Sequence, residues 1–169
     1  MKKVVLLFFI ILSFNSCSSL NWNTYTDQEN GFSIQYPNDW TKEVRGNSVV
    51  FLSQLESSGD QFKENVNFML QDLSQQQLTL DEYTQITKES VIANLGKQAI
   101  VSLKDATIQG IDEKEFVYNM NMNGNSLRIK QYWFIKNKKA YLFNYTAETS
   151  KYTEYETAAD KVVESFEFL

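Results

Sequence analysis

The sequence predicts an α+β domain, in which helices pack on an antiparallel β-sheet of about six strands. Three features of the chain carry this prediction. Apolar and polar residues alternate with a period of two in several segments after residue 30, as they do in strands that bury one face. Thr79-Leu80-Asp81-Glu82 forms a capping box in front of an amphipathic segment. Asn123-Gly124 lies between two long alternating segments, where a hairpin turn would lie.

The N-terminal residues have the pattern of an export signal. Lys2 and Lys3 precede an apolar run over residues 4–12, and the small Ser16 precedes Cys17. The nine residues of that run would extend only ~14 Å as a helix, whereas the hydrocarbon core of a bilayer is ~30 Å thick. We therefore predict a signal peptide over residues 1–16.

The end of this segment resembles a bacterial lipobox, in which the cysteine at the cleavage site is diacylated and becomes the new N-terminus. Cys17 is the one cysteine of the chain, and Ser18 and Ser19 follow it. Phe14 departs from the leucine that most lipoboxes have three residues before the cysteine. We predict lipidation of Cys17 and membrane anchoring through its acyl chains; the alternative is an ordinary signal peptide with an incidental cysteine.

The polar residues that follow have no clear period, so we expect residues 17–28 to be a lipidated N-terminus and tether and residues 29–169 to be the domain. Alternation predicts a first strand over residues 32–36, which Pro37-Asn38-Asp39 ends. Two more strands are predicted over residues 48–52 and 66–70, with an exposed polar loop between them.

The second half of the domain begins with the helix that the capping box predicts, over residues 79–95, and Gly96 ends it. Long strands follow, and the chain closes with a second helix, capped by Ser150, and a short last strand. These elements are expected over residues 99–108, 115–122, 127–135, 140–147, 151–165 and 166–169. Because apolar residues occupy both faces of the long strands, we expect both faces of the sheet to be covered, at least in part.

The composition excludes several kinds of site. The 169 residues include no histidine and one cysteine, so neither a Ser-His-Asp triad nor a histidine-based metal site can form. The formal net charge of −5 argues against a nucleic-acid partner, because such proteins neutralise phosphates with a basic face. We expect no cofactor, no metal and no catalysis.

Both ends of the predicted domain resemble PsbP-like domains of the PsbP/DcrB-like superfamily. Residues 31–40 (GFSIQYPNDW) are similar to the GFSF-YP-W opening of these domains, and residues 162–166 (VVESF) are similar to their closing helix and SF signature. The resemblance covers residues 29–169. It implies an α/β/α sandwich around an antiparallel sheet, and a non-catalytic role in docking to or stabilising other proteins.

Three residues are candidates for partner binding. Trp40, next to Tyr36-Pro37, would suit a peptide-binding platform; the alternative is an aromatic residue that closes the core. Arg128 and Lys130 alternate on a predicted strand and could meet an acidic partner; the alternative is a solvated strand face paired with Glu113 or Glu115.

Carboxylates offer the remaining chemistry. Asp112, Glu113 and Glu115, or the pair Asp81-Glu82, could supply the acid and base of a hydrolase, although such pairs arise by chance among 21 acidic residues. We expect a lipid-anchored envelope protein, on the periplasmic side of the outer membrane, that binds an unknown envelope protein. The alternatives are a periplasmic small-molecule binder, for which Arg128 would point into an aromatic pocket, and a carboxylate-based hydrolase.

Overall fold

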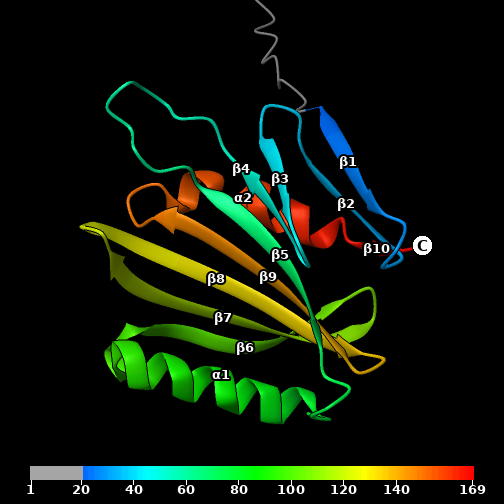
Figure 1. Cartoon of the computed structure of the whole chain (residues 1–169). Helices are drawn as coiled ribbons and strands as arrows, with labels where there is room; N and C mark the ends of the chain where they lie inside the picture. The colour runs from blue at the N-terminus through cyan, green and yellow to red at the C-terminus, as the bar shows by residue number, and fades with distance from the viewer. Residues whose placement is uncertain (1–20) are drawn as a thin grey trace, which may run out of the picture.

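The computed structural model describes residues 21–169, which form ten strands and two α-helices (Figure 1). The strands are β1 (Trp22–Asp27), β2 (Phe32–Pro37), β3 (Thr41–Arg45), β4 (Ser48–Leu52), β5 (Asn65–Asp72), β6 (Ile100–Ile108), β7 (Ile111–Met122), β8 (Asn125–Lys136), β9 (Lys139–Glu148) and β10 (Glu167–Phe168). The helices are α1 (Leu80–Leu95) and α2 (Tyr152–Glu164). The strands form a seven-stranded sheet, β3-β4-β5-β9-β8-β7-β6, and a three-stranded sheet, β1-β2-β10.

The predicted α+β class is confirmed, but the ten strands of the described residues exceed the expected number. Trp22–Asp27, expected to belong to a tether, instead pairs along its whole length with β2 as β1. Tyr25 fixes β1 to the domain, because its ring packs edge-on against Phe32 and Phe51, with centroids 6.1 and 6.4 Å away. The predicted signal peptide and Cys17 lie outside the described residues.

Tight turns join β6, β7, β8 and β9 into an antiparallel meander. In the β7–β8 turn, Asn123 and Gly124 have φ values of 52° and 87°, as a type I′ turn requires at both central positions. Asn137 and Lys138 have φ values of 52° and 59° in the β8–β9 turn. The hairpin predicted at Asn123-Gly124 is therefore confirmed, and its register sets which side chains share a face of the sheet.

The capping box at the start of α1 is also confirmed. The Glu82 backbone N–H donates to Thr79 Oγ1 over 3.2 Å, and the Thr79 N–H donates to Glu82 Oε2 over 2.8 Å. Gly96, with φ of 82°, ends the helix. The apolar side of α1 packs on one end of the large sheet, where Trp133 Nε1 donates to Thr84 Oγ1 over 3.1 Å.

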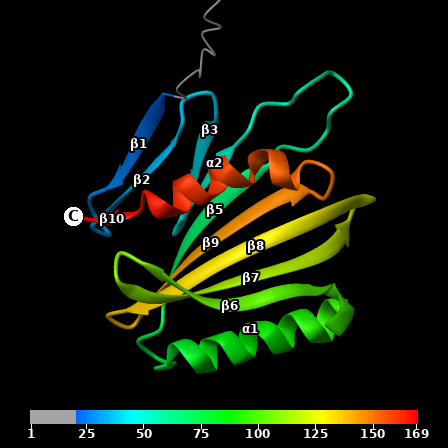
Figure 2. The same cartoon turned by 180° about the vertical axis from the view of Figure 1, so that it is seen from behind.

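The helix α2 covers the opposite face of the large sheet, so the two helices enclose it as a sandwich (Figures 1 and 2). Phe166 follows α2 and stacks on Phe32 and Phe68, with centroids 5.7 and 5.8 Å away. Ser165 Oγ accepts from the Gln35 N–H over 2.8 Å, which ties the end of α2 to β2. The expected Ser150 cap is wrong: Lys151 is the N-cap residue, and no side chain caps this helix. Within residues 21–169, no helix is long and apolar enough to cross a membrane.

Candidate functional site

A buried lysine lies beneath α2 among carboxylates. Lys130 of β8 is 6% exposed, and its Nζ lies 3.0 Å from both carboxylate oxygens of Asp160. The same Nζ lies 3.1 Å from Glu156 Oε1 and 3.8 Å from Glu115 Oε2. Glu156 and Asp160 are four residues apart on α2, so both face β8. Tyr132, on the same strand as Lys130, donates to Asp160 Oδ1 over 2.6 Å.

These contacts fix the protonation of Lys130 and Tyr132. Burial alone would lower the pKa of Lys130, but the hydrogen bonds and charges of Asp160, with Glu156 and Glu115, raise it above its usual value. Burial raises the pKa of Tyr132 strongly, and the hydrogen bond to Asp160 adds to the effect. Both groups therefore stay protonated at neutral pH, and they hold α2 to the sheet.

Glu113 of β7 is a second buried charged residue on this face. It is 5% exposed, and nothing within residues 21–169 donates a hydrogen bond to its Oε2. Burial, reinforced by the negative charge of Glu115 and opposed by Lys130, raises the pKa of Glu113 to about 7. Glu113 is therefore a carboxyl group whose charge changes near neutral pH.

A cavity of about 190 Å³ lies between α2 and the β6–β7 hairpin. Its lining includes four carboxylates and two buried aliphatic side chains: Glu113, Glu115, Asp160, Glu164, Ile108 and Val163. Within the described residues, no group of three or more Asp, Glu, His or Cys side chains is arranged to hold a metal ion. The cavity therefore presents separate negative charges beside an apolar wall.

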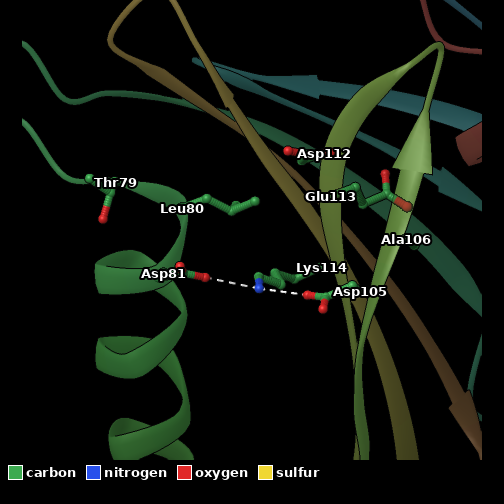
Figure 3. A pocket seen from close by; sticks show the side chains of 8 residues that line it. All are labelled: Thr79, Leu80, Asp81, Asp105, Ala106, Asp112, Glu113 and Lys114. Carbon is green, nitrogen blue, oxygen red and sulfur yellow. Dashed lines mark hydrogen bonds and ion pairs between the residues drawn. The ribbon is translucent and has the colours of Figure 1, made fainter.

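A larger hollow, of about 510 Å³, lies on the other face of the same hairpin, at the start of α1 (Figure 3). Lys114 Nζ bridges it, 2.9 Å from Asp81 Oδ1 and 2.6 Å from Asp105 Oδ1. The Asp81 and Asp105 side chains are 89% and 85% exposed, and such surface pairs contribute only ~0–1 kcal/mol each. Figure 3 shows the Glu113 carboxylate directed away from α1. This hollow therefore contains two ion pairs in which a mostly buried Lys114 meets exposed carboxylates.

The face of the large sheet on which α1 packs carries a row of amide side chains, which we call the amide row: Asn67, Gln131 and Asn144. These residues of β5, β8 and β9 are register partners, so their side chains stand next to one another on one face. Gln131 Nε2 donates to Asn144 Oδ1 over 2.6 Å. No group within residues 21–169 donates to Asn67 Oδ1 or Gln131 Oε1, although both atoms are buried.

The cover that α1 gives to this face ends at the amide row. Leu142 of β9 is 8% exposed, whereas Met69, its register partner on β5, is 36% exposed. Figure 1 shows β5 with α2 behind it and no helix in front. A groove of about 430 Å³ runs between α1 and the sheet, lined by Tyr83 and Ile86 of α1 and by Tyr118 and Gln131 of the sheet, among others.

This groove suits hydrogen bonding and apolar contact. Burial raises the pKa of Tyr83 and Tyr118, so neither phenol ionises near neutral pH. The amides of the row do not titrate at all. Ile86, which is 50% exposed, adds an apolar edge. The groove and the amide row can therefore hold a ligand but cannot exchange protons with it near neutral pH.

The structure places two of the three partner-binding candidates out of reach of a partner. Trp40 is 7% exposed and packs beside Tyr155, with ring centroids 6.3 Å apart, as expected of a core aromatic residue. Lys130 lies beneath α2 and not on a solvated strand face. Arg128 is partly buried: its Nε donates to Asn119 Oδ1 over 2.9 Å, and its guanidinium lies 5.2 Å from the centre of the Tyr152 ring.

The carboxylates suggested by the sequence divide between the two faces. Asp81 and Asp112 line the hollow beside α1, whereas Glu115 lines the cavity beneath α2 and Glu113 borders both. The amide row is not among the sites that the sequence predicts. A signal was present for two of its members, because Asn67 and Asn144 each lie between two buried apolar or aromatic neighbours in a strand; Gln131 follows Lys130 and lacks that signal. Asp160 was also missed, because its helix meets β8 only in the folded chain.

Comparisons with known proteins agree with this architecture. The PsbP family model matches residues 21–168. A cyanobacterial PsbP (CyanoP) from Synechocystis has 18% identity and a TM-score of 0.63, with 92% of this chain and 99% of that chain covered. A Pseudomonas aeruginosa protein of unknown function has 17% identity and a TM-score of 0.61, with 85% and 94% covered.

A third structure is LpqN, involved in cell envelope biogenesis of Mycobacterium tuberculosis. It has 16% identity and a TM-score of 0.58, with 88% of this chain and 90% of that chain covered. No curated protein matches the sequence. At such identities the structures show the fold alone, whereas the family model covers most of the chain. The chain belongs to the PsbP family.

Proposed function

We propose that the protein is a lipid-anchored domain of the cell envelope that binds another protein without catalysis, and that the amide row and its groove form the binding surface. One observation carries the proposal: Asn67 Oδ1 and Gln131 Oε1 are buried acceptors without donors in the described chain. Leaving such a group without a hydrogen bond costs ~1–3 kcal/mol. Asn67 and Gln131 are partly exposed residues whose oxygens are buried, so a turn of each amide would present its oxygen to the backbone N–H donors of a partner polypeptide lying across the row. Met69 and Ile86 would contact the apolar side chains of that partner.

The two alternatives have less support. A hydrolase would place its substrate between carboxylates. In the hollow of about 510 Å³, Asp81 is ion-paired with Lys114, at 2.9 Å. The cavity at Glu113 and Glu115 measures about 190 Å³, below the ~300–1,000 Å³ of most ligand pockets. Glu115 is also ion-paired with Lys104, at 3.1 Å. A small-molecule binder would use an inward-pointing Arg128, whose guanidinium contacts Asn119 and Tyr152 instead.

The proposed location rests on the sequence of the N-terminus and on a relative. The run that ends at Cys17 resembles a lipobox, and LpqN is involved in cell envelope biogenesis. We place the domain on the periplasmic side of the outer membrane, held by acyl chains on Cys17, with no nucleic-acid partner. Acyl chains suit a chain of net charge −5, because such a chain gains no attraction from anionic lipids.

The proposal is tested with the tagged full chain, crosslinked chemically in its own cells. The variant combines Asn67→Leu and Gln131→Leu, which removes both unpartnered acceptors. The matched control combines Asn38→Leu and Gln85→Leu, which changes the same residue types at exposed positions away from the row. We expect a discrete crosslinked complex in the wild type and the control and its loss in the variant. The same complex in all three would contradict the proposal.

A further inference from the structure

The cavity between α2 and the β6–β7 hairpin carries an excess of negative charge. Glu113, Glu115, Asp160 and Glu164 line it. The buried ammonium group beside it, Lys130 Nζ, already contacts Asp160 and Glu115. The other nearby ammonium group, that of Lys104, extends into solvent from Glu115. Both ammonium groups therefore form their ion pairs with carboxylates other than Glu113, although the charge of Lys130 still acts on Glu113 from a distance.

Glu113 is the side chain that points to a ligand. It is 95% buried, since its exposed fraction is 5%, and its Oε2 accepts no hydrogen bond from the described chain. A buried carboxylate without a partner is strongly unfavourable, because it loses its hydration and gains nothing in exchange. Glu113 lines the cavity, so a cationic donor that entered it would supply the missing charge, and a turn of the Glu113 carboxyl group would bring Oε2 to the donor.

The walls of the cavity select among cations. A divalent metal ion requires several oxygens converging on one point, at ~2.0–2.6 Å, and the described residues provide no such group. An ammonium group is satisfied by separate acceptors at ordinary hydrogen-bond distances, because its three N–H donors point in different directions. Ile108 and Val163 would contact an aliphatic stem.

The volume agrees with an ammonium group on a short aliphatic chain. About 190 Å³ holds roughly six non-hydrogen groups at ~30 Å³ each, the share of one water in the liquid. A lysine side chain from Cβ to Nζ has five such groups. The Gln109 side chain in the hairpin turn donates to the carbonyl oxygen of Phe166, just after α2, and so ties together the two elements that form the cavity.

We propose that this cavity binds an alkylammonium group, either the lysine side chain of a partner protein or a free small diamine. The site lies on the opposite face of the sheet from the amide row and does not depend on the function proposed for that row. Glu113 receives the ammonium group, Glu164 at the exposed rim attracts it, and Ile108 and Val163 pack against its methylene groups.

The test uses calorimetric titration of the full chain in detergent at pH 8, where Glu113 is mostly ionised. The probes are Nα-acetyl-lysine methylamide, 1,5-diaminopentane, the uncharged Nα-acetyl-norleucine methylamide, and calcium chloride. We expect saturable binding of at least one amine and none of the norleucine compound. Binding of the lysine compound assigns the site to a partner protein, and binding of the diamine alone assigns it to a free amine.

Variants locate the binding. Glu113→Gln removes the charge with little change of shape, and we expect it to weaken amine binding at least ~10-fold. Glu164→Gln, on an exposed helix position where folding is not at risk, should weaken it by a smaller factor. Asp112→Asn, next to Glu113 but outside this cavity, should leave affinity unchanged. Three results would each overturn the proposal. The first is that Glu113→Gln and Glu164→Gln bind the amine with the same affinity as each other. The second is that no amine binds saturably, and the third is that calcium binds in place of amines.

Discussion

Replacing Glu113 with glutamine should change how stability depends on pH. Burial and the charge of Glu115 raise the pKa of Glu113 from 4.5 to about 7, so the folded state holds a proton that the unfolded chain releases. The contribution of Glu113 to stability is therefore fully present below about pH 4.5 and is lost as the pH rises to about 7. At ~1.4 kcal/mol per pKa unit, the free energy of unfolding falls by about 3 kcal/mol in all as the pH rises, and about 2.5 kcal/mol of this change occurs between pH 5 and pH 8.

Urea unfolding measures this effect directly. The free energy of unfolding is determined for the wild type and for Glu113→Gln at intervals between pH 5 and pH 8. We expect the difference between the two to shift by about 2.5 kcal/mol over that range, in favour of the variant at high pH. Asp112→Asn is the matched control, because the Asp112 carboxyl is next to Glu113 in the sequence but does not line the cavity beneath α2. A difference that stays constant with pH would refute a buried Glu113 that titrates near neutrality.

Three further changes test other parts of the structure. Cys17→Ala should move the protein from the membrane fraction to the soluble fraction, and an unchanged membrane fraction would contradict lipidation. Thr79→Ala should lower the free energy of unfolding by about 1 kcal/mol, because it removes the side-chain cap of α1; urea unfolding measures it, and no loss would contradict the capping role. Lys130→Met should cost about 2 kcal/mol by the same measurement, since it leaves Asp160 without its cation in a partly exposed site. A neutral effect would mean that Lys130 does not hold α2 to the sheet.

The strands and the first helix could be predicted because their signals are local. The Thr79 to Glu82 capping box and the Asn123-Gly124 turn each satisfy backbone groups within a few residues. β1 and β3 lack such signals. All five residues of β3 are exposed, so no apolar alternation marks it. β1 is held by its pairing with β2 and by the packing of Tyr25 on Phe32 and Phe51, which are contacts with other parts of the chain.

The candidate sites depend on contacts between distant parts of the chain, which a single sequence does not contain. Arg128 and Lys130 have the same alternating pattern, yet α2 covers Lys130 because Asp160 and Glu156 lie above it. The sequence shows Glu113 as one acidic residue among others. Its burial without a hydrogen-bond donor follows from the packing of α2 against the β6–β7 hairpin. For Trp40, an aromatic residue beside a turn is compatible with a binding platform and, more often, with the core, and the structure places it in the core.

Under the proposed function, the amide row and its groove hold a partner polypeptide. The most direct measurement is photo-crosslinking in living cells from a photoreactive residue at Met69, which lies beside the row and is 36% exposed. Leu55, 45% exposed in the loop between β4 and β5, is the control position. The proposed function predicts a discrete crosslinked product from position 69 that is absent from position 55 and lost in the Asn67→Leu, Gln131→Leu background. No product from position 69, or one that persists in that background, would contradict it.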